Sequence, residues 1–68
     1  MRNIGERIKH FRNKQGITQV KLSEITSIEQ TVISRYENGV IVPPIPKLEK
    51  IAKALKIPLT ELLKDQSA

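Results

Sequence analysis

The stretch that decides the fold is residues 18–39, which read TQVKLSEITSIEQTVISRYENG. Thr18 at its start is a good N-cap residue, because a threonine hydroxyl accepts a hydrogen bond from a free N–H of the first helical turn. Leu22 and Ile25 follow at helical spacing. The pattern therefore predicts a helix over residues 19–26.

A short turn should separate this helix from the next one. The Thr-Ser pair at 26–27 has poor helix propensity, since both side chains compete for nearby backbone groups, and Ile28 is typical of a buried hinge residue. The next helix is expected over residues 29–37, where three apolar residues recur at helical spacing: Val32, Ile33 and Tyr36. Asn38 and Gly39 form a strong stop, with Asn38 expected in left-handed geometry. Two short helices joined by such a turn make a helix-turn-helix.

Apolar stripes on either side of this motif predict three more helices. A helix over residues 4–15 carries Ile4, Ile8 and Phe11, with Asn3 as candidate N-cap and Gly16 as its left-handed end. Residues 40–46 (VIVPPIP) should form a rigid connector, because proline pushes the preceding residue toward extended geometry. The two last helices carry Leu48, Ile51, Ala52 and Leu55, and then Leu59, Leu62 and Leu63, with Pro58 in the first turn. We expect an all-α, compact five-helix domain.

Length and composition restrict what this domain does. The chain has 68 residues, which is one small domain near the size at which a hydrophobic core alone holds a fold. It has no cysteine, so disulfides and thiolate metal sites do not supplement that core. Its longest apolar stretch is residues 40–42, far short of a membrane span, and its start lacks the apolar run of a secretory signal. We expect a soluble, cytoplasmic protein without membrane contact.

The positive charge is concentrated in the first third of the chain. Net charge is +5, and residues 22–68 hold equal numbers of basic and acidic residues. The excess therefore lies in residues 1–21, where Glu6 opposes Arg2, Arg7, Lys9, Arg12, Lys14 and Lys21. This distribution favours a polyanionic partner, because lysine and arginine on phosphates release condensed counterions. A solvated basic helix face is the alternative.

Residues for catalysis or metal binding are scarce. The chain has one His, one Asp and no glycine-rich phosphate loop. His10 has no second His three or four residues away, so a surface position is expected rather than a metal site. We expect no enzyme activity, no catalytic residues, no cofactor and no small-molecule ligand.

The central motif also resembles a known family. Residues 18–25 (TQVKLSEI), Ile28 and residues 32–39 (VISRYENG) are similar to the helix-turn-helix of the XRE family, which includes the lambdoid phage repressors and Cro. The segment at 33–39 is the specific part, whereas the apolar stripes would fit any helical bundle. The resemblance implies a repressor-type DNA-binding domain over residues 4–64, with the helix-turn-helix at about 19–38 and a frayed tail at 65–68.

In that family the second helix of the motif enters the major groove of DNA. Carried over, this makes the helix at 29–37 the reading helix, and spacing leaves five residues on its outward face: Glu29, Gln30, Thr31, Ser34 and Arg35. Gln pairs with adenine, Arg with guanine, and Thr contacts a thymine methyl group. These residues are the predicted base contacts, although an ordinary solvated face would look the same.

The resemblance also implies supporting residues. Gln19 is similar to a family residue that holds a phosphate at the start of the first motif helix, and Asn38 to one that meets the phosphate after the reading helix. Lys21 is the third predicted phosphate contact. Arg12 and Glu37 match positions that are paired in the phage repressors, so a largely enclosed ion pair is expected there.

Four departures from the family pattern stand out. Ser27 replaces a turn glycine, which costs about 1 kcal/mol if a positive φ is required there. Ser23 replaces a small alanine between the helices, and Glu29 a capping serine, so Glu29 is a weaker cap with a carboxylate suited to a cytosine amino group. Val40 and Ile41 stand where a basic pair often follows Asn-Gly.

The function implied is a transcriptional regulator, most simply a repressor, that binds double-stranded DNA at a palindromic operator as a homodimer. An antitoxin or a restriction-modification controller would use the same domain. A third possibility is a protein-interaction module that docks through residues 40–42. For the dimer we expect contacts from this connector and from Leu59 and Leu63, whereas an inward packing of Val40 and Val42 onto the following helix is the alternative.

Overall fold

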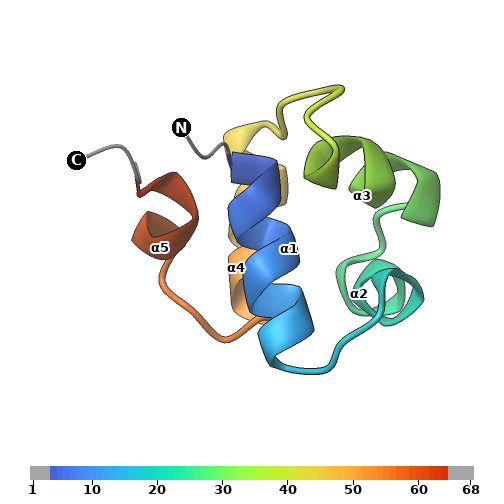
Figure 1. Ribbon diagram of the computed structural model, residues 1–68, viewed down its shortest axis with the longest axis horizontal. Helices are drawn as coiled ribbons and strands as arrows, with labels where there is room; N and C mark the ends of the chain where they lie inside the picture. Colours follow the sequence, from blue (N-terminus) through green and yellow to red (C-terminus); the bar gives the residue numbers. More distant parts are fainter. Residues whose placement is uncertain (1–3, 65–68) are drawn as a thin grey trace.

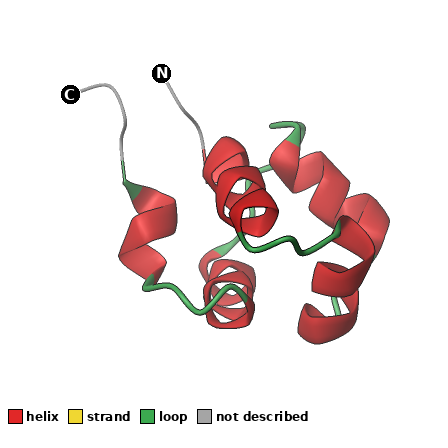
Figure 2. Cartoon of the chain, turned by 60° about the horizontal axis from the view of Figure 1, so that its bottom comes forward, coloured by secondary structure: helices red, strands yellow, loops and turns green. Residues whose placement is uncertain are grey.

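The computed structural model describes residues 4–64, and within that range the chain forms helices and loops but no strand (Figures 1 and 2). The helices are α1 (Ile4–Lys14), α2 (Gln19–Thr26), α3 (Gln30–Glu37), α4 (Ile45–Ala54) and α5 (Leu59–Leu63). In Figure 1, α1 and α4 occupy the centre, α2 and α3 lie on one side of them and α5 on the other. The prediction of an all-α five-helix domain is confirmed.

Every helix contributes to one core. The apolar side chains that are almost fully buried come from all five helices and from the end of α4: Ile8, Leu22, Ile33, Leu48, Ile51, Leu55 and Leu62. Ile28 in the α2–α3 turn is also buried, as expected, whereas Val32 is only half-buried against the core. The helix-turn-helix is thereby anchored through both of its helices and through its turn.

The helix ends follow local side-chain chemistry. Thr18 caps α2, because its Oγ1 accepts a hydrogen bond from the Lys21 N–H at 3.0 Å. At the other end of α2, the buried Thr26 hydroxyl donates to the Leu22 carbonyl at 2.7 Å and accepts from the Ile28 N–H at 3.3 Å. Gly16 ends α1 with a φ of 69°, as the sequence predicts. The proposed cap Asn3 and the tail at 65–68 lie outside the described residues.

The connector prediction was wrong at its end. Ile45 and Pro46 belong to α4, which begins with Pro44 as its N-cap residue. A proline in the first turn loses no intrahelical hydrogen bond, since the N–H groups there have no partner within the helix. Pro58 shows the opposite shift, because it is the N-cap residue of α5 rather than a member of its first turn.

Ser27 adopts the left-handed conformation, with φ 60° and ψ 26°. This is the position at which the XRE pattern has a glycine. We therefore expect Ser27→Gly to stabilise the protein by about 0.5 kcal/mol, because relief of the left-handed strain exceeds the extra entropy of an unfolded glycine. Chemical unfolding followed by circular dichroism measures the change. Ser23→Gly, inside α2, is the control and should cost about 0.5 kcal/mol. A loss of stability in Ser27→Gly would contradict the strain at this turn.

Candidate nucleic-acid interface

One side of α3 is locked into the fold and the other is open to solvent. Ile33, Tyr36 and Glu37 are buried. Gln30, Thr31 and Arg35 are exposed on the other side, and Ser34 is half-buried. Glu29 is exposed too, but it is the N-cap residue of α3 rather than its first helical residue, and its side chain makes no capping hydrogen bond. The residues predicted to read bases therefore share one accessible helix face.

A buried ion pair fastens the end of α3 to α1. Arg12 Nε donates to Glu37 Oε2 at 2.6 Å and Arg12 Nη2 donates to Oε1 at 2.9 Å, so the contact is bidentate. The exposed fraction is 10% for the Arg12 side chain and 1% for that of Glu37. Arg12 Nη1 also donates to the Ile17 carbonyl at 2.8 Å, before α2 begins. The structure thus brings the predicted pair together and ties three segments of the chain to it.

Gln19 is part of the same network. Its Nε2 donates to Glu37 Oε1 at 3.1 Å, which links the first residue of α2 to the last residue of α3. This contact was not anticipated from the sequence, from which Gln19 was expected only as a phosphate contact. The second N–H of the same amide, together with the free N–H groups of the first turn of α2, stays available to an anion. Lys21, two residues further along α2, is exposed.

The end of α3 differs from the expectation in one respect. Asn38 has φ −89° and ψ 1°, so its predicted left-handed geometry is wrong, and Gly39 takes that conformation with φ 76°. The Asn38 N–H donates to the Ser34 carbonyl at 3.0 Å, the Gly39 N–H donates to the Tyr36 carbonyl at 3.2 Å, and Asn38 Nδ2 donates to Ser34 Oγ at 3.4 Å. The glycine turns the chain, which leaves the exposed Asn38 side chain beside the outward face of α3.

Two of the basic residues in the first third of the chain are structural. Arg7 and Arg12 have exposed fractions of only 7% and 8%. Arg7 Nε donates to the Glu61 carbonyl, its Nη2 lies 3.4 Å from Glu61 Oε1, and its guanidinium carbon lies 5.4 Å from the centre of the Phe11 ring. The interpretation of all six residues as a basic surface is therefore wrong for these two. Lys9, Lys14 and Lys21 are exposed and stay available to a polyanion.

A sequence signal for the burial of Arg7 existed. Arg7 follows Ile4 by three residues and precedes Phe11 by four, which places it on the apolar stripe of α1 rather than opposite it. Its guanidinium joins α1 to α5, so it holds the fold as Arg12 does.

The connector after α3 exposes its apolar side chains. Val40 is 66% exposed and Val42 is 76% exposed, which contradicts the alternative in which both pack inward on α4. Ile41, Ile45 and Leu63 are exposed as well, and Leu59 is half-buried. Pro43 is the one buried residue of the connector between Val40 and Pro44.

Other features of the described residues bear on function only indirectly. His10 is exposed and contacts the Phe11 ring edge-on, with 5.1 Å between the ring centres. Across residues 4–64, no helix has the length and apolar character that a membrane crossing requires.

Comparison with known proteins places the chain in a family. A family model described as "Helix-turn-helix" matches residues 8–62. The transcriptional repressor RghR of Bacillus subtilis is 34% identical over 64 residues, which is 93% of this chain and 47% of RghR. The chain spans less than half of the length of the curated relatives that it matches.

Two solved structures are similar over nearly their whole length. SinR, described as a master regulator for biofilm formation and solved in complex with DNA, has a TM-score of 0.86 and 31% identity, covering 90% of this chain and 98% of SinR. The P22 c2 repressor with a synthetic operator has a TM-score of 0.87 and 31% identity, covering 94% of this chain and 97% of the repressor. With the matching family model, these similarities show that the chain belongs to the XRE-type helix-turn-helix family.

Proposed function

We propose that this protein is a sequence-specific DNA-binding transcriptional regulator that acts as a repressor, with α3 as its reading helix. The observation that carries the proposal is the two-sided α3, buried through Ile33, Tyr36 and Glu37 and exposed through Gln30, Thr31 and Arg35. SinR and the P22 c2 repressor, whose folds are similar, were both solved with DNA. The relatives named above are regulators or repressors, which supports a protein that is not an enzyme and that works in the cytoplasm.

Different residues are expected to contact bases (reading) and phosphates (holding). Arg35 suits guanine and Gln30 suits adenine, since each presents two hydrogen-bonding groups that match one base edge. Thr31 supplies a methyl group or a hydroxyl to the neighbouring position. Ser34 lies between Thr31 and Arg35 on α3, and Glu29, just before the helix, adds an acceptor for a cytosine amino group. Gln19, Lys21 and Asn38 lie at the two ends of the motif, where phosphate contacts fix its register on the duplex.

Substitution at Arg35 should separate reading from holding. Arg35→Ala is expected to cost about 1–3 kcal/mol on the preferred site and to relax discrimination at one base pair. Lys21→Ala is expected to weaken binding to all DNA sequences by the same factor and to reduce the slope of log K against log salt concentration. Site selection from a random duplex pool supplies the operator, and titrations on operator and scrambled duplex give both effects.

The same titrations test the proposal itself. If Arg35→Ala lost the same binding free energy on the operator and on the scrambled duplex, Arg35 would not contact a base edge. Affinity that hardly responds to salt would contradict DNA binding and favour an apolar interaction module instead. An antitoxin or a restriction-modification controller would pass both tests, and the genes regulated by the selected site distinguish them.

The domain is expected to bind as a homodimer on a palindromic operator. One helix reads only a few base pairs, and a two-fold dimer places two reading helices about one turn, ~34 Å, apart. Val40 and Val42, exposed at 66% and 76%, form an apolar surface that a second copy would cover, together with Leu59 and Leu63. Charged residues are depleted at the centre of such contacts, which suits an uncharged connector.

A double variant tests the dimer contact. Val40→Lys with Ile41→Lys should keep the helical signal, since both side chains are exposed, and should lose cooperative binding to the palindrome. Binding to a single half-site should persist, and it is the internal control. Unchanged cooperativity would place the dimer contact elsewhere.

A further inference from the structure

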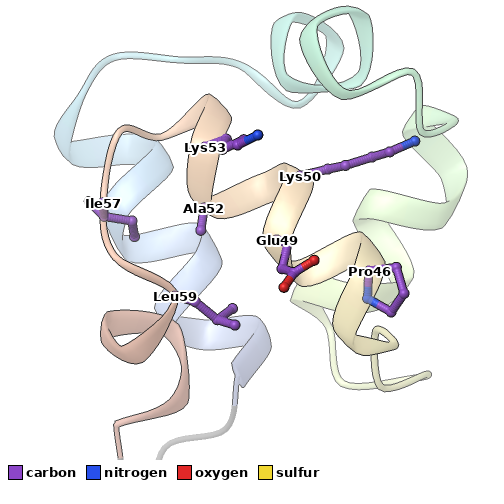
Figure 3. A pocket seen from close by; sticks show the side chains of 7 residues that line it. All are labelled: Pro46, Glu49, Lys50, Ala52, Lys53, Ile57 and Leu59. Carbon is purple, nitrogen blue, oxygen red and sulfur yellow. The ribbon is translucent and has the colours of Figure 1, made fainter.

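A second surface, formed by α4 with the start of α5 and the end of α2, has features that DNA reading does not use. A hollow of about 560 Å³ beside α4 is lined by Pro46, Glu49, Lys50, Ala52, Lys53, Ile57 and Leu59 (Figure 3). An adjoining hollow of about 380 Å³ is lined by Ile25, Thr26, Ser27, Lys50, Lys53 and Ala54. Lys50 and Lys53 line both hollows, and no residue of α3 lines either.

The two hollows have apolar floors. Ala52, Ile57 and Leu59 come from α4, the loop after it and the start of α5 (Figure 3). In the second hollow Ile25, which is 48% exposed, contributes the apolar wall. Side chains of leucine size would bury apolar area in both, which is the usual way in which an amphipathic helix is anchored in a groove.

The rim between the hollows carries lysines whose positive charge no ion pair within residues 4–64 neutralises. Figure 3 shows the Lys50 side chain extending toward the turn between α2 and α3, and Lys53 pointing to the same side of α4. Lys47 and Lys56 continue the positive charge along this helix and just beyond it. Within residues 4–64 none of these four lysines forms an ion pair, and Glu49 is the only acidic residue that lines the two hollows.

We infer that this α4 surface docks an acidic amphipathic helix of a partner protein, with apolar side chains in the two hollows and carboxylates on Lys50 and Lys53. Charge complementarity decides the occupant. A second copy of this chain, which has a net charge of +5, would bring the same lysines against each other. A nucleic acid would satisfy the lysines but not the hollows, whose linings include no aromatic side chain on which bases stack.

Such a partner would reach the domain without covering the predicted base contacts. Gln30, Thr31, Ser34 and Arg35 are absent from both linings, so the docked helix and the duplex need not compete for the same side chains. The Lys50 side chain nevertheless extends toward the turn that precedes α3 (Figure 3). An acidic partner is therefore placed close enough to the motif to influence DNA binding electrostatically.

The test uses the full chain and a displayed library of random peptides about 15 residues long, which is enough for a marginal helix. Binders are selected on the wild type and counter-selected on Lys50→Glu with Lys53→Glu. We expect enriched peptides with apolar residues at helical spacing and carboxylates between them. A synthetic copy of one such peptide should shift amide NMR signals of Lys53, Ile57, Leu59 and Ile25.

A matched charge control distinguishes this surface from general attraction. Lys50→Glu with Lys53→Glu should weaken the peptide about tenfold or more, whereas Lys9→Glu with Lys14→Glu, which makes the same charge change on α1, should weaken it less than about twofold. Ile25→Ser should also weaken binding while the unfolding midpoint is kept. Equal losses in both charge variants, enriched peptides without apolar spacing, or signal shifts confined to α3 and the connector would overturn the inference. Shifts of Lys53, Ile57 and Ile25 on concentrating the protein alone would also overturn it, in favour of a second copy. Leu59 is left out of this comparison because it belongs to the proposed dimer contact.

Discussion

Gly5→Ala is expected to cost about 3 kcal/mol of folding free energy, because α1 approaches α3 too closely for any side chain at this position. A Cβ added to Gly5 would lie 2.0 Å from the Tyr36 carbonyl oxygen and 2.9 Å from that of Glu37. Both neighbours are backbone atoms, so no rotamer change relieves the contact. One helix must move, and the packing of Ile8 with Ile33 and the Arg12–Glu37 pair would suffer with it.

Thermal and urea unfolding followed by circular dichroism measure this loss. A domain of this size has a total stability of roughly 3–10 kcal/mol, so the variant should lose much of it and should melt about 15 °C lower. Gly16→Ala is the control, since Gly16 has a φ of 69° and nothing lies within 4 Å of its added Cβ. That variant carries only the conformational cost, about 1 kcal/mol. Equal losses at Gly5 and Gly16 would contradict the close approach of α1 to α3.

The sequence contains no sign of this contact. Ile8 and Phe11 lie on the stripe that predicts α1, and Gly5 lies on the same helix without interrupting that pattern. The helix positions follow from spacing, which is local, whereas the distance between two helices depends on how every core side chain fills the space between them. The six boundaries of the first three helices were therefore predicted to within one residue, but the place where two backbones nearly touch was not.

The candidate site shows the same division between local and distant information. Spacing on α3 assigns Gln30, Thr31 and Arg35 to the outward face, because one turn of helix fixes which residues share a side. The hydrogen bond from Gln19 to Glu37 joins residues 18 positions apart, and no local pattern predicts it. The burial of Arg7 was predictable only in part. Its place on the apolar stripe was visible, but its partner Glu61 is 54 positions away.

Glu37→Gln is expected to cost about 3 kcal/mol of folding free energy, because the change removes the charge that balances a buried guanidinium. Three donor groups reach this carboxylate, namely Nε and Nη2 of Arg12 and Nε2 of Gln19. A glutamine has the same shape but only one acceptor oxygen. Its NH₂ group would replace the other carboxylate oxygen and would face the donors of Arg12 and Gln19. Arg12 would keep its bond to the Ile17 carbonyl, but at 10% exposure its side chain has little access to water.

The exposed ion pair between Lys64 and Glu61 is the control for the buried one. Lys64 Nζ lies 3.0 Å from Glu61 Oε2 with 59% of the lysine side chain exposed, so Lys64→Gln should change stability by less than about 0.5 kcal/mol. Arg12→Met combined with Glu37→Leu should lose less than the two single variants summed, since no charge is stranded when both partners are apolar. Urea unfolding at one pH gives the stability changes of all five variants. A loss below about 0.5 kcal/mol for Glu37→Gln would mean that α3 is held by its apolar side alone, and additive losses in the double variant would mean that Arg12 and Glu37 stabilise the fold independently.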